Sequence, residues 1–280
     1  MTILYATDCN ENSVSALRYA QKLSLQLNAQ LVLLYVYDIP PVAGRTIKTE
    51  EQLQRSLKGE KLELLTRYYR ENGIKDQQKL SIHFWAEYGI SIADTILEYA
   101  LTLNCELVLV GMKDEHTKRG MFSGNIANKL LKNVNCKLLI VPNTFEYSTI
   151  TSIAYATDFE NADVRAISEL KQLFPHKEVT VKIVHVTTDE NTKEGEQMEW
   201  FKEILLEKIP GESISFHLIN AQTVPLGLRM FIGDENSSMI ALLEREEQSV
   251  FKRLFHKDLI KSMESQIKIP ILSINPKSLN

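Results

Sequence analysis

Cysteine, long apolar runs and clustered metal ligands are all scarce in this 280-residue chain. Cys9, Cys105 and Cys136 are too widely spaced for a disulfide framework or a zinc site, so we interpret them as free thiols. No apolar stretch approaches the ~18 residues of a membrane-spanning helix. No basic and apolar leader precedes the first strand-like segment, so we expect no export signal. Together these features predict a protein of the reducing cytoplasm without a membrane partner.

Residue sets for catalysis are also missing. The six histidines are scattered, with neither a His-x-Glu motif nor a pair at helical spacing. Ser123 precedes Gly124 but lacks the Gly-x-Ser-x-Gly elbow of a serine hydrolase. We therefore predict no catalytic residue and no metal site. The net charge of −4 gives no reason to expect nucleic acid or an anionic membrane as a partner.

Hydrophobic residues make up 44% of the chain and follow a repeating pattern of strands and helices. The first half reads βαβαβαβαβ, over residues 2–6, 14–27, 31–37, 50–71, 80–85, 91–103, 106–110, 125–132 and 137–141. Asn12 or Ser13 is expected to cap the first helix, and Ser91 the third. The continuous apolar run at 31–37 is typical of a strand buried on both faces. The pattern predicts a doubly wound α/β fold with a parallel sheet between helices.

The second half repeats this order. Tyr-Ala-Thr-Asp occurs at Tyr5–Asp8 and again 150 residues later at Tyr155–Asp158, an interval that suits a whole domain. Strands are expected at 151–156, 180–187, 213–219, 239–243 and 270–274, and helices at 163–173, 194–208, 224–232 and 257–265. We predict a duplication with domains at 1–144 and 150–277.

The turn after the first strand is the first candidate site. In an open parallel sheet, ligands bind at the carboxyl ends of the strands, where Thr7, Asp8 and Cys9 are expected to lie. Asp8 could accept hydrogen bonds from ribose hydroxyls or an adenine amino group. Equally, Asp8 and Asp158 could cap the turn or bond across a domain interface. Cys9 is either a redox-sensitive thiol or a small residue that fits a tight turn.

The second candidate follows the fourth strand. Gly111 ends that strand, and the loop after it leads to Gly124, Asn125 and Ile126 at the start of a helix. Backbone N–H groups at a helix start attract anions, and glycine lets a phosphate approach closely. The alternative interpretation is a basic surface loop with an ordinary helix cap.

These residues resemble the universal stress protein family, in the tandem form that carries two such domains in one chain. The similarity is strongest at Ile3–Asp8, at Ile153–Asp158, at 31–36 and at 107–142. It implies two Rossmann-like domains of the adenine nucleotide alpha hydrolase type, with five parallel strands in the order 3-2-1-4-5. By resemblance, ATP or another adenine nucleotide would contact Ala6, Thr7, Asp8, Val36, Gly111, Gly124, Asn125 and Ile126.

The first domain departs from the phosphate-loop pattern Gly-x2-Gly-x9-Gly-Ser/Thr of nucleotide-binding members. Asp114 stands at the second glycine position, and Asn125 replaces the hydroxyl residue. A carboxylate close to a triphosphate costs on the order of a kcal/mol or more. We therefore expect impaired ATP binding, and better tolerance of ligands with fewer phosphates.

The second domain departs further. Phe251–Leu254 matches the segment before the third glycine, and this alignment places Glu244, Glu247 and Lys257 on the glycine positions. Asp258 then falls on the hydroxyl position. Without a single glycine, this half is expected to bind no ATP and to serve structure or dimerisation.

The resemblance implies a cytoplasmic stress-response protein whose two domains pair within the chain through the strands near 138–141 and 271–274. Pairing of two chains is a further expectation. The leading hypothesis is a sensor of adenine nucleotide. A scaffold or interaction protein with two degenerate sites is the second. A weak ATPase ranks last, because no general base is evident.

Overall fold

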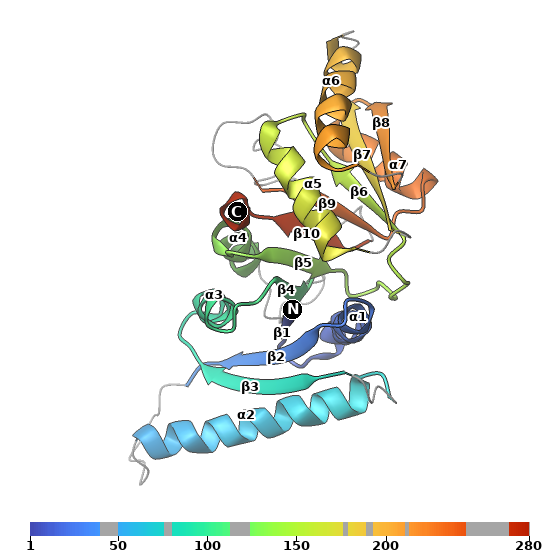
Figure 1. The fold of residues 1–280 in the computed structure, drawn as a ribbon. Helices are drawn as coiled ribbons and strands as arrows, with labels where there is room; N and C mark the ends of the chain where they lie inside the picture. Colours follow the sequence, from blue (N-terminus) through green and yellow to red (C-terminus); the bar gives the residue numbers. More distant parts are fainter. Residues whose placement is uncertain are drawn as a thin grey trace. The chain divides into compact units, whose positions relative to one another are not determined.

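The computed structural model describes residues 1–39, 50–75, 80–112, 124–175, 179–188, 193–210, 213–244 and 269–279. The chain divides into two compact units, Met1–Tyr147 and Ser148–Asn280 (Figure 1). The predicted helix at 257–265 and the residues Asp114, Glu247, Phe251–Leu254, Lys257 and Asp258 lie outside the described residues.

The first unit is a five-stranded parallel sheet with helices on both faces. Its elements are β1 (Thr2–Ala6), η1 (Glu11–Ser13), α1 (Val14–Gln26), β2 (Gln30–Tyr37), α2 (Glu50–Asn72), β3 (Ile82–Tyr88), α3 (Ile92–Thr102), β4 (Leu107–Gly111), α4 (Gly124–Asn133) and β5 (Lys137–Val141). The strand order is β3-β2-β1-β4-β5, which confirms the predicted 3-2-1-4-5. Figure 1 shows α1 on one face of the sheet, α3 and α4 on the other, and α2 beside β3.

The central strands are apolar because both of their faces are covered. Ile3, Leu4 and Tyr5 of β1 are fully buried. Edge strand β3 instead alternates between exposed and covered residues. The strand expected at 80–85 is confirmed, but its bounds are wrong: the parallel pairing with β2 begins at Ile82 and continues to Tyr88, opposite Tyr37. Backbone pairing with a neighbour therefore decides its bounds, which local composition does not reveal.

The two predicted helix caps of the first unit have different outcomes. The Ser91 side chain accepts from the Asp94 N–H at 3.4 Å, which confirms the predicted cap of α3. The predicted cap of α1 is wrong, because Ser13 makes no side-chain cap bond to that helix. Asn10 instead caps the preceding turn η1, where its side chain accepts from the Ser13 N–H at 3.1 Å. The short 3-10 turn thus takes over the capping role at this helix start.

The second unit repeats the same topology. Its elements are β6 (Ser152–Ala156), α5 (Asn161–Leu173), β7 (Thr180–Thr187), α6 (Lys193–Lys208), β8 (Ile214–Asn220), α7 (Val224–Asp234), β9 (Met239–Leu243), β10 (Ile271–Ile274) and η3 (Pro276–Ser278). Its parallel strands run in the order β8-β7-β6-β9-β10, the same order as in the first unit. α5 begins two residues before the predicted Asp163, because a capping box of Glu160 and Asp163 starts it.

The similarity between the two units extends to backbone detail. Cys9 and Phe159, which occupy equivalent positions after β1 and β6, both have positive φ angles, of 58° and 67°. Asn104 and Asn236, which follow α3 and α7, do the same at 46° and 48°. Asparagine tolerates this left-handed conformation, whereas a bulky side chain such as phenylalanine rarely adopts it. The turn after the first strand therefore has one backbone shape in both units.

Each unit has a glycine where a loop packs closely against a helix, but the glycine lies in the loop in one unit and in the helix in the other. A Cβ on Gly89, just after β3, would lie 1.9 Å from Thr95 Oγ1 of α3. The equivalent loop residue of the second unit is Ala221, and the helix residue there is Gly227. A Cβ on Gly227 would lie 2.5 Å from Val186 Cγ1. Each unit thus keeps one of the two positions free of a side chain, because the interior has room for only one.

An aromatic cluster holds the end of the first unit against α1. The Tyr19 ring of α1 lies 4.8 Å from the Tyr147 ring and 5.9 Å from the Phe145 ring, centroid to centroid. The Ser15 hydroxyl donates to the backbone oxygen of Pro142 at 3.2 Å. These contacts fix the segment that follows β5.

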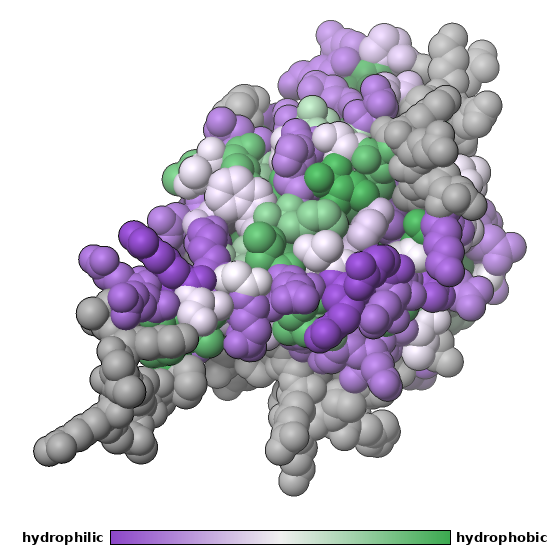
Figure 2. All heavy atoms as spheres, turned by 90° about the horizontal axis from the view of Figure 1, so that it is seen from below, coloured by the Kyte–Doolittle hydropathy of each residue, from purple (hydrophilic) through white to green (hydrophobic). Residues whose placement is uncertain are grey.

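The molecular surface is mixed in polarity. Figure 2 shows hydrophilic side chains around a smaller group of hydrophobic ones on the face seen from below. The most exposed large apolar residues of the described chain include Ile90, Leu101 and Trp200. Single exposed apolar residues are ordinary in soluble domains. Among the described residues, none of the helices is both long and apolar enough to cross a bilayer.

Candidate functional site

Asp8 lies immediately beyond the carboxyl end of β1, and its carboxylate is held by the turn that follows. Its Oδ2 accepts from the Asn10 side-chain amide at 2.6 Å, and its Oδ1 accepts from the Ser13 hydroxyl at 2.6 Å. The Asn10 backbone N–H also donates to Oδ1 at 3.4 Å. The carboxylate is only partly buried, so its oxygens remain within reach of a ligand while the turn orients them.

Thr7 supports this turn from below. It is 1% exposed, and its backbone N–H donates to Leu34 O at 3.0 Å. Its hydroxyl oxygen accepts from the Cys9 N–H at 3.1 Å and lies 3.2 Å from Tyr5 OH. The Tyr5 phenol donates its proton to Ser13 O at 2.8 Å. The buried Thr7 side chain therefore stabilises the turn from the core side.

The other predicted contacts lie toward the same edge of the sheet. The register places Ala6 of β1 beside Leu34 of β2 and Val110 of β4. Val36 is the last residue but one of β2, and Gly111 is the last residue of β4. A Cβ on Gly111 would lie 3.4 Å from the Ala16 methyl group, so this strand end approaches α1 closely. α4 follows β4, so Gly124, Asn125 and Ile126 begin a helix at this edge.

The equivalent turn of the second unit has a different hydrogen-bond pattern. Asp163 occupies the position of Ser13, is fully buried, and accepts from Tyr155 OH and Thr157 Oγ1, both at 2.8 Å. It also accepts from the Glu160 N–H at 3.2 Å. Sequence reasoning missed Asp163, although the Glu-x-x-Asp spacing before a helical pattern was a usable signal. The carboxylate that organises this turn points into the core.

Phe159 fills the space beside this second turn. Its ring is 9% exposed and stacks on His185, with centroids 4.3 Å apart, while the Phe201 ring lies 5.6 Å away. His185 Nδ1 lies 2.8 Å from Thr157 O, so Nδ1 carries the proton and donates. Its Nε2 lies 3.9 Å from Glu194 Oε1. The first unit has the much smaller Cys9 in place of Phe159.

Cys9 is a partly buried thiol. Desolvation, together with the nearby Asp8 carboxylate, raises the pKa of this thiol to about 12. Buried Tyr68 of α2 lies close by, and burial raises the pKa of its phenol too. A thiol that stays protonated is a poor nucleophile, which favours the small turn residue over the redox-sensitive thiol.

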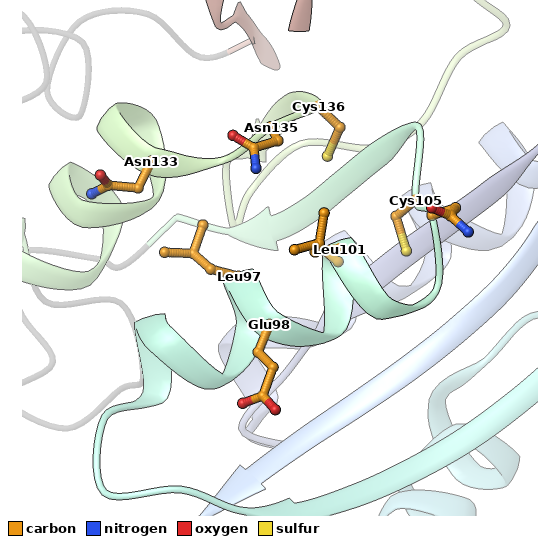
Figure 3. Close-up of a pocket in the computed structure, with 9 residues that line it drawn as sticks. Leu97, Glu98, Leu101, Cys105, Asn133, Asn135 and Cys136 are labelled. Carbon is orange, nitrogen blue, oxygen red and sulfur yellow. The ribbon is translucent and has the colours of Figure 1, made fainter. Parts of the chain in front are cut away.

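A separate pocket of about 400 Å³ holds the other two thiols (Figure 3). Leu97 and Leu101 of α3 line it, with Cys105 and Cys136 just before β4 and β5. These residues lie at the amino ends of the strands, opposite the edge that carries Asp8. Burial raises the pKa of both thiols to about 12. No group of three or more metal-ligating side chains occurs among the residues that the structure describes.

The raised thiol pKa values predict slow modification. At pH 8 a thiol of pKa about 12 is ionised ~1,000-fold less than an ordinary thiol of pKa ~8.5. Ellman's reagent should therefore label all three cysteines of the folded chain at least ~100-fold more slowly than those of the urea-unfolded chain. Stoichiometric labelling of one thiol within the mixing time would contradict the burial described here.

A model of the universal stress protein family matches residues 1–142, half of the chain. The chain belongs to this family. A universal stress protein of Methanocaldococcus jannaschii is 24% identical over 140 residues, which cover 50% of this chain and 80% of that protein. The resemblance drawn from the sequence is thereby confirmed.

Solved structures extend the likeness to the whole of this universal stress protein. A universal stress protein from Archaeoglobus fulgidus has a TM-score of 0.69 at 15% identity, with 98% of both chains covered. A functionally unknown protein from Pseudomonas aeruginosa has a TM-score of 0.63 at 15% identity, covering 99% of this chain and 93% of that one. At such identity the likeness shows the fold, and the repeated topology fits a tandem arrangement.

Proposed function

We propose that this universal stress protein is a cytoplasmic stress-response binding module whose first domain binds an adenine nucleotide at the edge that carries Asp8. The observation that supports it best is the partly buried Asp8 carboxylate at the end of the central strand. Ala6 and Gly111, which have a small side chain or none, end the adjacent strands β1 and β4 at the same edge of the sheet. A carboxylate in this position can accept hydrogen bonds from the ribose hydroxyls.

We further propose that phosphate binding in this domain is impaired. The argument rests on the sequence: Asp114 replaces a phosphate-loop glycine and Asn125 the hydroxyl residue. Repulsion between a carboxylate and a triphosphate weakens as phosphates are removed, since fewer charges remain. The expected affinity order is therefore AMP or ADP above ATP, the reverse of a site built around the triphosphate.

The second domain is proposed to be a structural half without a nucleotide. Phe159, stacked on His185, occupies the space that the first unit leaves to Cys9. The buried Asp163 is committed to three protein donors. With the domains at 1–144 and 150–277, pairing of the two within the chain and pairing of two chains are the quaternary arrangements that we propose.

Calorimetric titration of the purified chain with ATP, ADP and AMP tests the sensor. Asp8→Asn should weaken binding by about 10- to 100-fold, because a hydrogen bond to a charged group contributes ~1.5–3 kcal/mol. The matched change Asp158→Asn should leave the affinity unaltered. Asp114→Gly combined with Asn125→Ser should strengthen ATP binding.

If none of the three nucleotides produces binding heat or a thermal shift, the sensor hypothesis is rejected and the scaffold hypothesis remains. The Asp8 bonds to Asn10 and Ser13 favour that alternative, because the turn already satisfies the carboxylate. Equal losses in Asp8→Asn and Asp158→Asn would also contradict the proposal. Phosphate release above a protein-free blank would support the weak ATPase.

A further inference from the structure

A larger cavity of the first unit lies beside α1, and none of the residues proposed to hold the nucleotide lines it. Its volume is about 580 Å³. One wall is α1, with Arg18 and Lys22, and another is the end of the α2 region at Gly73 and Ile74. The segment 143–147, fixed to α1 by the aromatic cluster, closes a third side.

Two cationic side chains line this cavity, and each is held by a contact with a neighbouring residue. Arg18 and Lys22 are four residues apart on α1, so they project from the same face of the helix. The Arg18 Nε donates to the backbone oxygen of Asn72 at 3.0 Å, which orients the guanidinium. The Lys22 ammonium lies 5.7 Å from the centroid of the Tyr147 ring, a cation–π contact.

Neither cation forms an ion pair within 4.0 Å in the described part of the chain, whose ion pairs include none to Arg18 or Lys22. Glu11 and Glu146 line the same cavity but make no such pair with them. Like charges four residues apart repel each other, and a bound anion would relieve that repulsion. Because two unpaired cations border a cavity, an anion is the ligand that the site favours.

The duplication provides an internal comparison. Helices α1 and α5 align with Ser13 at the position of Asp163, which places Ser168 and Gln172 of α5 where α1 has Arg18 and Lys22. The core positions Ala16 and Ala166 are the same in both helices. The fold therefore keeps the buried face of the helix but does not require the two cations.

We propose that this cavity is a second ligand site of the first unit, which binds a small oxyanion with at least two negative charges between Arg18 and Lys22. The planar guanidinium suits two oxygens of one phosphate or carboxylate group, and the ammonium suits a further oxygen. The site shares no lining residue with the nucleotide edge at Asp8. Phosphate groups and dicarboxylates share this chemistry.

The test is NMR titration of the full-length chain with inorganic phosphate and, separately, with succinate at constant ionic strength. The amides of Arg18, Lys22, Ile74 and Thr144 are expected to shift with saturation. Preference for one titrant identifies the class of oxyanion. The double variant R18Q/K22Q should weaken binding at least about tenfold, since each charge-assisted contact contributes ~1.5–3 kcal/mol.

The matched control is R165Q/K208Q, which removes the same two charges from exposed positions of α5 and α6. It should bind as the unaltered chain does. An equal loss in both double variants would mean general charge attraction and would overturn the site. So would shifts confined to residues near Asp8 and Gly111, or no saturable shift with either titrant. An unchanged thermal midpoint in R18Q/K22Q shows that the variant is folded.

Discussion

Asp163→Ala is expected to lower the free energy of unfolding of the second unit by about 3–5 kcal/mol, because it leaves buried donors without their acceptor. Three donors converge on this carboxylate, from Tyr155, Thr157 and the Glu160 N–H. Tyr155 and Thr157 are at most 1% exposed, so water cannot replace the lost acceptor without opening the core. The change also removes half of the capping box that starts α5.

Urea unfolding followed by tryptophan fluorescence measures this loss. The chain has two tryptophans, and Trp85 lies in the first unit while Trp200 lies in the second. A Trp85→Phe background therefore reports the second unit alone. Ser13→Ala at the equivalent position, measured through Trp85 in a Trp200→Phe background, should cost only about 1 kcal/mol. Equal losses at the two positions, or a loss under ~1 kcal/mol for Asp163→Ala, would contradict the account.

Gly227→Ala is expected to destabilise the second unit by about 1–3 kcal/mol, through overpacking of its interior. The new Cβ would lie 2.5 Å from Val186 Cγ1, 2.9 Å from Val186 Cγ2 and 3.1 Å from the Ala221 Cβ. A separation under 3.0 Å forces Val186, which is 6% exposed, or the helix itself to move. The higher helix propensity of alanine, about 1 kcal/mol, offsets only part of this cost.

The same substitution elsewhere on α7 is the control. Gly233 also lies in α7, and a Cβ there meets nothing within 4 Å. Gly233→Ala should therefore stabilise the unit by about 0.5–1 kcal/mol, by reducing the entropy of the unfolded chain. Opposite signs for two glycine-to-alanine changes in one helix exclude helix propensity as the explanation. Adding Ala221→Gly to Gly227→Ala should recover only the part of the loss due to the Ala221 contact.

Much of the architecture could be predicted from the sequence. The apolar runs at 2–6 and 137–141 predicted β1 and β5 with their observed bounds, because strands covered on both faces are apolar throughout. Ser91 marked the start of α3. The repeated Tyr-Ala-Thr-Asp predicted two domains of one topology, and both units have that strand order.

The candidate site was less accessible to such reasoning. Asp8 and Asp158 both end a Tyr-Ala-Thr-Asp segment, yet their turns differ because Ser13 in one unit corresponds to Asp163 in the other. Cys9 and Phe159 share one backbone conformation, but only the phenylalanine meets a histidine ring. Such differences depend on residues that folding brings together, and local patterns do not record them.

The sequence by itself determined the α/β class, the repeat of the strand-and-helix pattern and the position of Asp8 after the first strand, because periodic burial follows from local apolar patterns. The strand order was implied by the family resemblance. Only the tertiary structure decided which carboxylate turns inward, which glycine has no room for a methyl group, and that Arg18 and Lys22 share a cavity with Tyr147. Packing and hydrogen bonding act over a few ångströms in space, and they join residues that lie far apart along the chain.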